Sequence, residues 1–346
     1  MHESMERIGD LDLSEENSTE TEPDEIEARQ LLQGSSVRDD TTFWDRLNEE
    51  ARAQVAWIDS CPRLDRAAEI RAAQRIETAR KRYRRTVFES GYALSHILDA
   101  LSQVEAGELP LHEVARISAE DSLENEYLRQ RIPEILTSLR PLFRHTYEDF
   151  SSSLQPGLPC PERLELAHNL SSRRRECALL IEVLNIHRQK VEFLMRDLVA
   201  MSERMEELQR ELAQQHPREC VSEWLADAPA DENEERAELH ELMFRSLETP
   251  ATLQRRGAKL ASLHAGYEQG RKDLVDPHLR LVVAVVRLYL AAGEARGLSV
   301  QHLIKAGSER LWAATDHYDW QSGYRFASYA LHWVRSGITR AIEHAE

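Results

Sequence analysis

The chain has 346 residues, enough for about two or three domains, and 41% of them are hydrophobic. Gly and Pro are scarce, at 13 and 12, and aromatic residues make up 6%, which favours a helix-rich chain over a β-rich one. The formal net charge of −17 argues against a partner as acidic as DNA. That charge is uneven, because the first thirty residues are strongly acidic and the segment from Leu274 onward is about neutral.

The four cysteines show no CxxC pair and no histidine at zinc-ligand spacing. We therefore expect reduced structural thiols, no metal and no cofactor. The acidic, polar N-terminus does not resemble a signal peptide, and no apolar stretch is long enough to span a bilayer. These features are typical of a cytoplasmic protein without a membrane partner.

Residues 1–40 combine low hydrophobicity with high charge, which predicts an acidic, disordered leader. Residues 41–105 form the first helical segment. Its pattern strengthens from Leu64, where apolar residues follow at three-residue steps, and Asp65 is placed to cap that helix. The segment ends at the break formed by Gly107 and Pro110.

Residues 106–270 form a second helical segment. A helix from about 121 to 150 is expected to be interrupted at Pro133 and Pro141. After a loop, one long helix is predicted over about 161–215, and helices over 234–247 and 250–274 follow. The long helix carries a heptad seam, which consists of Val191, Leu194, Leu198, Met201, Met205, Leu208 and Leu212. The seam fits an antiparallel helical pair within the chain or a dimerising coiled coil.

Three further helices are predicted over 275–292, 299–315 and 324–344, with Gly293, Gly297 and Gly323 at the breaks. No strand alternation appears, so the fold class is all-α.

No P-loop, dinucleotide fingerprint, nucleophile elbow or zinc-protease motif is present, and an enzyme is not expected. Two basic clusters, 81–85 and 173–175, fit solvated helix faces better than phosphate sites.

Six aromatic side chains fall within sixteen residues near the C-terminus: Tyr318, Trp320, Tyr324, Phe326, Tyr329 and Trp333. Arginines are interleaved with them. Aromatic faces stack on unpaired bases and cations hold the backbone, so this cluster fits a surface for single-stranded nucleic acid. On composition alone, the core of a small helical domain is the better interpretation.

Three stretches of the C-terminal segment, one of which contains this cluster, occur in the following order: LRLVVAVVRLYL, GLSVQHLIKAG and LWAATDHYDWQSGYRFASYALHWVRSGITRAI. In this order they resemble the second conserved region of the sigma-70 family of bacterial transcription initiation factors, over 274–346. The stretch PRLDRAAEIRAAQRIETAR, from Pro62 to Arg80, resembles the family's first conserved helix more weakly. The resemblance therefore makes 106–270 a helical, non-conserved insert.

The resemblance implies a factor that binds core RNA polymerase, reads the −10 promoter element and traps the melted non-template strand. It assigns DNA contacts to Tyr324, Arg325, Phe326, Tyr329, His332, Trp333, Arg335, Ser336, Thr339 and Arg340. Within that set, Tyr329 would stack on a flipped adenine, and Thr339 would read the paired upstream position. It assigns contacts with the clamp of the largest polymerase subunit to His302, Lys305, Ala306, Ser308 and Trp312.

Several positions depart from the family pattern. His332 replaces one aromatic of the pair that props open the bubble, and Ser336 replaces a glutamine. Lys305 and Ala306 stand where the family carries acidic and amide groups, so weak polymerase binding is expected. The family's two later domains do not follow, which fits a fragment, a truncated product or a degenerate paralogue. The alternative function is a non-initiating interaction protein, either a polymerase-binding decoy or a helical scaffold.

Overall fold

The computed structural model describes residues 23–33, 41–45, 47–115, 122–155, 157–215, 234–295 and 297–344. These residues are almost entirely helical, and their only β-type pairing is an isolated bridge between Ala115 and Ile186. The all-α prediction is therefore confirmed. No helix within these ranges is long and apolar enough to cross a membrane.

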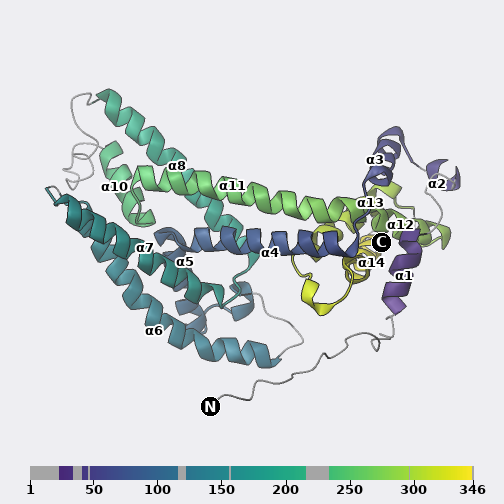
Figure 1. The fold of residues 1–346 in the computed structure, drawn as a ribbon, viewed down its shortest axis with the longest axis horizontal. Coiled ribbons are helices and arrows are strands. Elements are labelled where there is room, and N and C mark those ends of the chain that lie inside the picture. Colours follow the sequence, from purple (N-terminus) through teal and green to yellow (C-terminus); the bar gives the residue numbers. More distant parts are fainter. Residues whose placement is uncertain are drawn as a thin grey trace, which may run out of the picture. The chain divides into compact units, whose positions relative to one another are not determined.

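The chain divides into two compact units (Figure 1). Unit 1 comprises residues 1–73 and 271–346, and unit 2 comprises residues 74–270. Two helices, α4 (Arg66–Phe88) and α11 (Pro250–Val275), include the points where the chain passes from one unit to the other. Unit 1 otherwise contains α1 (Pro23–Gln33), α2 (Thr41–Asp45), α3 (Glu49–Ser60), α12 (Leu279–Ala291), α13 (Val300–Thr315) and α14 (Phe326–Glu343).

The core of unit 1 lies where α12, α13 and α14 pack together. Val282 and Val286 of α12 and Leu311 of α13 are fully buried there. α13 and α14 approach closely at Gly337, because a Cβ atom at this position would lie 3.0 Å from the carbonyl oxygen of Ala306. A larger side chain at 337 would push apart the two helices that carry the proposed contact residues.

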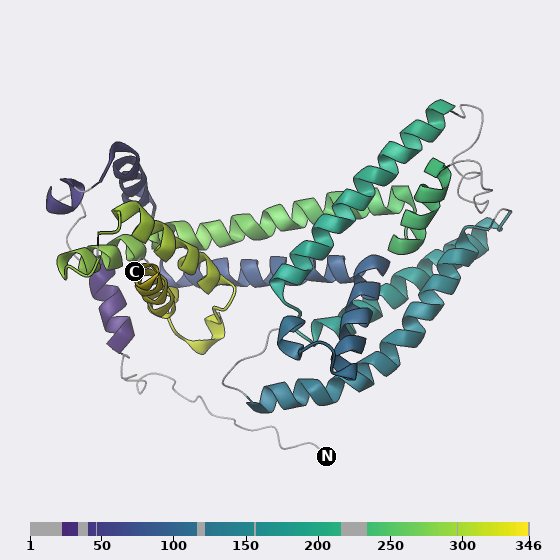
Figure 2. The ribbon, with the colours of Figure 1, turned by 180° about the vertical axis from the view of Figure 1, so that it is seen from behind.

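Unit 2 contains α5 (Gly91–Ala106), α6 (Ser122–Ser153), α7 (Cys160–Glu182), α8 (Arg188–Gln215) and α10 (Glu234–Ser246), with the inner parts of α4 and α11. α6 lies beside α7, and α8 beside α10, as the view from behind also shows (Figure 2). All seven residues of the heptad seam on α8 are buried within this single chain. The seam therefore packs intramolecularly, as the first of the two interpretations predicted.

Two predictions about unit 2 are wrong. The helix expected over 161–215 is two helices, because Asn185, in the turn that follows the first of them, adopts a left-handed conformation with φ 48°. The bridge from Ile186 to Ala115 then fixes the turn. Conversely, α6 continues through Pro133 and Pro141. The buried stripe that includes Leu136 and Leu139 offsets the lost backbone hydrogen bonds.

The disordered leader predicted over 1–40 is also wrong in part, because residues 23–33 form α1. This helix packs against α12 and α14, and Ala28 is buried in the contact. Tertiary packing thus outweighs the polar composition of the segment. Residues 1–22 and 34–40 lie outside the described residues. Asp65 caps α4 as predicted, since its Oδ1 accepts a hydrogen bond from the Ala68 amide at 2.6 Å.

We expect Leu208→Ala to lower the free energy of unfolding by about 2–5 kcal/mol, because Leu208 is fully buried in the α8 seam and truncation leaves a cavity. Leu164→Ala is the matched control, since Leu164 on α7 is 66% exposed and should change stability by no more than about 0.5 kcal/mol. Urea unfolding followed by circular dichroism measures both. Equal effects would mean that the seam is not a core.

Candidate nucleic-acid interface

One face of α14 is solvent-accessible and carries most of the residues assigned to DNA. Tyr329 and Trp333 are half-buried, and an exposed group lies beside them on the same helix: His332, Ser336, Thr339 and Arg340. At 100° per residue these six positions fall within one arc, opposite the buried side chains of Ala330, Val334 and Ile338. Tyr324, which precedes the helix, is 43% exposed.

The aromatic side chains form a continuous series of ring contacts from the core to this face. His278 and Phe326 meet edge to face with their centroids 4.9 Å apart, and Phe326 meets Tyr318 at 5.1 Å. Tyr318 then contacts Tyr329 at 5.7 Å, and Tyr329 contacts Trp333 at 6.3 Å. These separations suit favourable aromatic pairs. The outer rings are therefore held by inner ones.

Phe326 occupies a different place from the one that sequence suggested. Its side chain is fully buried between His278 and Tyr318, so it does not share the exposed face of Tyr329. Helical spacing of three and four residues brings Phe326 close to the arc of Tyr329 and Trp333, but Phe326 lies at the inner edge of that arc. Phe326 therefore fits the core interpretation of the aromatic cluster, and the nucleic-acid surface stays a prediction for Tyr329 and Trp333.

A buried carboxylate sits beneath the start of α14. Glu69 of α4 is fully buried, and its Oε1 accepts the backbone N–H of Phe326 at 2.6 Å. The helix has no side-chain cap of its own, so Glu69 supplies one from a distant segment. A negative charge at a helix N-terminus is also favoured by the helix dipole. Oε2 of the same carboxylate lies 2.9 Å from Nε of Arg325.

Arg66, one turn earlier on α4, holds the segment before α14. Its guanidinium donates to the carbonyl oxygens of Gly323 at 2.8 Å and Tyr324 at 2.6 Å, and it lies 3.2 Å from Glu69. The Tyr318 hydroxyl lies 3.1 Å from Glu69 and 2.8 Å from the carbonyl oxygen of Tyr324. Burial, together with the Glu69 charge, raises the pKa of Tyr318 to about 12, so this hydroxyl stays protonated.

The basic residues assigned to the DNA backbone differ in how far they are engaged. Arg325 pairs with Glu69, and Arg335 pairs with Glu27 of α1. Arg340 is exposed and forms no ion pair with any described residue. The hydroxyl of Thr339 forms a hydrogen bond with that of Tyr289 at 2.9 Å. Arg340 is therefore the most available cation of the three.

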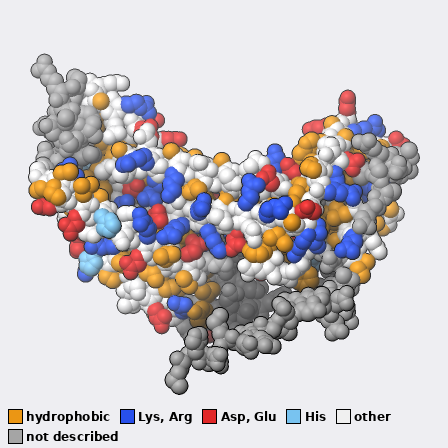
Figure 3. Space-filling model, in the orientation of Figure 1, with side chains coloured by type: hydrophobic (Ala, Val, Ile, Leu, Met, Phe, Trp, Pro, Cys, Tyr) orange, Lys and Arg blue, Asp and Glu red, His pale blue; other side chains and the backbone are white. Residues whose placement is uncertain are grey.

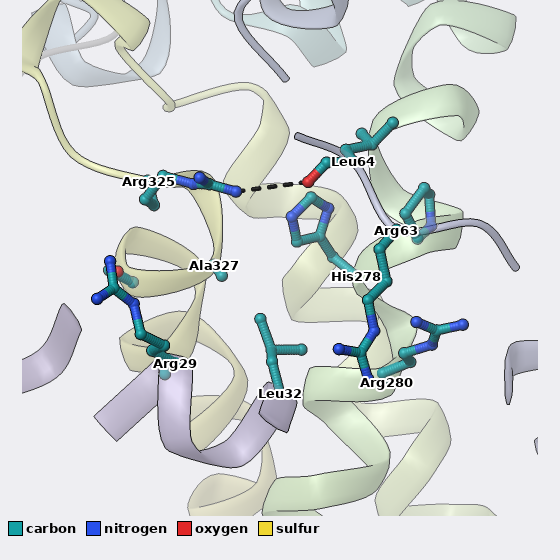
Figure 4. A pocket seen from close by; sticks show the side chains of 11 residues that line it. Arg29, Leu32, Arg63, Leu64, His278, Arg280, Arg325 and Ala327 are labelled. Atoms are coloured by element: carbon teal, nitrogen blue, oxygen red, sulfur yellow. Dashed lines mark hydrogen bonds between the residues drawn. The ribbon is translucent and has the colours of Figure 1, made fainter. Parts of the chain in front are cut away.

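A cavity of about 230 Å³ lies beside the start of α14 (Figure 4). Four arginines from four different segments line it: Arg29, Arg63, Arg280 and Arg325. Arg280 donates to the carbonyl oxygen of Asp59 at 2.9 Å, and Arg325 reaches that of Leu64 at 3.5 Å. Such a lining suits an anion, and phosphate is matched well by guanidinium groups.

The residues assigned to the polymerase lie on the outward arc of α13. His302 and Lys305 are exposed, and Ala306, Ser308 and Trp312 are half-buried. Arg271 covers Trp312, since its guanidinium carbon lies 5.0 Å from the ring centroid. His302 and Lys305 are therefore open to a partner, whereas the Ser308 hydroxyl is buried and Trp312 is partly occupied within unit 1.

Comparison with known proteins finds a family match in the C-terminal segment. The family model for Sigma-70 region 2 matches residues 274–346. These residues are similar to the second conserved region of sigma-70 factors. The RNA polymerase sigma factor SigA of Nostoc sp. is 42% identical over 80 residues, which cover 23% of this chain and 19% of that protein. RpoS of Coxiella burnetii is 39% identical over 80 residues, covering 23% and 22%.

SigA of Microcystis aeruginosa gives the same result, with 42% identity over 74 residues that cover 21% of this chain and 17% of that protein. The matched segment thus spans about a fifth of the length of each relative. The suspected resemblance to the sigma-70 family is confirmed, and it rests on region 2.

Sequence reasoning missed Glu69 and Arg66, which support region 2 from outside the matched segment. Glu69 falls on the buried face of α4 with Ala72, Ala73 and Ile76, at helical spacing. A carboxylate on an apolar helix face needs a partner, so this position was a signal that a buried polar contact existed. Its partner, the Phe326 amide, has no side-chain signature.

We expect Glu69→Gln to lower the unfolding free energy of unit 1 by about 3–5 kcal/mol, because it removes a buried charge from beside two arginines. Glu77→Gln on the same helix is the control. Its surface pair with Lys81 should contribute about 0.2–1 kcal/mol. Thermal unfolding of both variants tests this. A Glu69→Gln variant as stable as the control would contradict the buried cap.

The buried His278 predicts a loss of stability in acid. Burial lowers its pKa below the ordinary value of about 6.5, although its hydrogen bond to the Leu274 carbonyl acts in the opposite sense. The unfolded chain therefore binds a proton that the folded chain does not. Below pH 6.5 the unfolding free energy should fall by up to about 1.4 kcal/mol per pH unit from this group.

Urea unfolding between pH 7 and 5 measures that dependence, and His278→Asn should reduce the slope. Parent and variant curves that remain parallel over this range would show that His278 does not contribute.

Proposed function

We propose that this chain is a sigma-like subunit that binds core RNA polymerase, recognises the −10 promoter element and captures the melted non-template strand. The observation that carries the proposal is the half-buried ring pair of Tyr329 and Trp333 on the open face of α14, inside a region 2 domain. The named relatives are RNA polymerase sigma factors. The chain has no need of catalysis for this role.

Strand capture requires that an unstacked base find a ring to replace its former neighbours. Unstacking costs a few kcal/mol, and one base–aromatic stack returns about 1–3 kcal/mol. Tyr329 offers such a ring, and Arg340 lies on the same face for the backbone. The arginine-lined cavity beside α14 suits a phosphate of the same strand. Arg335 would first have to exchange its partner Glu27 for a phosphate.

The outward arc of α13 is the proposed contact with the polymerase clamp. Lys305 gives this arc a cation, and a like charge against a basic partner surface is unfavourable. The proposal therefore includes weak binding to core polymerase by this chain. His332 stands where the family has one aromatic of the pair that props open the bubble. Its ring is smaller and more readily hydrated than an indole, so promoter opening should be inefficient.

We expect Tyr329→Ala to weaken binding to a labelled single-stranded −10 oligonucleotide by about 1–3 kcal/mol, the value of one lost base stack. Fluorescence anisotropy with core polymerase present measures it. Tyr127→Ala is the matched control, because Tyr127 is a 54% exposed tyrosine on α6 of unit 2. The control should bind as the parent does.

The same titration with a scrambled oligonucleotide separates recognition from general affinity. A Tyr329→Ala variant that remains helical and keeps the parent's preference for the −10 sequence would exclude the stacking role.

A further inference from the structure

Unit 2 contains a two-helix stem formed by α4 and α11, which run antiparallel along its length. Tyr83 stacks on Tyr267 with centroids 6.3 Å apart, and Arg256 donates to the carbonyl oxygen of Thr86 at 3.0 Å. Near the other end, a Cβ atom at Gly270 would lie 3.4 Å from Ile76. These three contacts fix which sides of the helices face each other.

The stem is strongly basic although the whole chain carries −17. Residues 74–88 and 250–270 hold two carboxylates, Glu77 and Glu268, against a larger set of cations. The cations are Arg75, Arg80, Lys81, Arg82, Arg84, Arg85, Arg255, Arg256 and Lys259. Concentrated like charge is unfavourable by itself, so this surface is suited to an acidic partner.

Most of these cations remain at the surface. Arg84 and Arg256 are bound to the carboxylates of Glu182 and Glu248 within unit 2. Lys81 and Arg85 form more exposed pairs with Glu77 and Glu89. Arg82, Arg255 and Lys259 are exposed and form no ion pair with any described residue. Figure 3 shows Lys and Arg side chains gathered over α4 and α11 on one face of the molecule.

Helix geometry places the exposed cations together. Arg75, Arg82 and Arg85 lie at i, i+7 and i+10 on α4, and Arg255 and Lys259 lie at i and i+4 on α11. Relative to the contact between the two helices, the cations of α4 and the cations of α11 point to the same side of the stem. We call these five side chains the basic stripe. On α4 the stripe extends over about 15 Å, at 1.5 Å per residue, which suits several backbone phosphates.

We infer that the basic stripe binds the phosphate backbone of double-stranded DNA without reading its sequence. The exposed residues among the α4 cations are Gln74 and Thr78, so the stripe has no exposed aromatic ring on which a base could stack. A protein partner would also need an apolar or aromatic anchor, because such anchors dominate protein interfaces. A surface that offers cations but neither exposed aromatic rings nor apolar anchors fits backbone phosphates best.

This inference goes beyond the proposed function and does not require it. A chain that holds a melted strand on α14 would gain a second, sequence-independent contact with the duplex. The two contacts differ in chemistry, since one depends on rings and the other on charge.

The test uses the full chain and a labelled 30-base-pair duplex that lacks any −10-like sequence, titrated by anisotropy at several salt concentrations. The triple variant Arg82→Gln, Arg255→Gln, Lys259→Gln removes three exposed cations that have no carboxylate partner among the described residues. The logarithm of the association constant should depend less steeply on the logarithm of salt concentration. The slope should fall in magnitude by about 0.9 for each contact, or about 2.7 for three.

The matched control is Arg129→Gln, Arg163→Gln, Arg210→Gln, which makes the same charge change at exposed positions of α6, α7 and α8. It should leave the slope near that of the parent. Tyr329→Ala should also leave duplex binding unchanged, so failure here is distinct from failure of strand capture. Equal slopes for the two triple variants, or no duplex binding by the parent at low salt, would overturn the inference.

Discussion

The carboxylate of Glu69 joins the start of α14 to α4, across 257 positions of sequence. Burying a charge is unfavourable by several kcal/mol unless donors surround it. Here the Phe326 amide, the Tyr318 hydroxyl and two arginines provide them. The direction of α14, and with it the exposed arc of Tyr329 and Trp333, depends on that arrangement. A helix capped from within its own chain segment would lack this link to α4.

The same link joins the two separate chain segments that form unit 1. Unit 2 occupies residues 74–270, between the two parts of unit 1. The chain enters and leaves it at adjacent positions, as the contact of Gly270 with Ile76 shows. Because loop-closure entropy rises only slowly with length, an insert whose ends meet adds little cost to closing unit 1. Glu69 and Arg66 lie before the point of entry, so the contacts with α14 are complete without the insert.

Sequence predicted the helices well where local chemistry decides them and poorly where tertiary contacts do. Glycines with positive φ end α5 and flank α13 as expected, and the heptad seam is buried. Pro133 does not interrupt α6, because the apolar stripe on either side of it is buried. In the site, helical spacing located the face of Tyr329. It could not place Phe326 in the core, since that depends on His278 and Tyr318 from other segments.

The series of ring contacts also bears on how a flexible strand could be held. A side chain that binds by stacking loses rotamer freedom, which lowers affinity. Tyr329 has lost much of that freedom already, because its ring contacts the rings of Tyr318 and Trp333. His332 lies outside this series, exposed and without a described ring contact. A base that stacks on Tyr329 therefore meets a ring already ordered, whereas one that meets His332 must order that side chain as it binds. The two neighbouring positions on α14 are unequal for this reason, and the preorganised one is the stronger candidate to capture a flipped base.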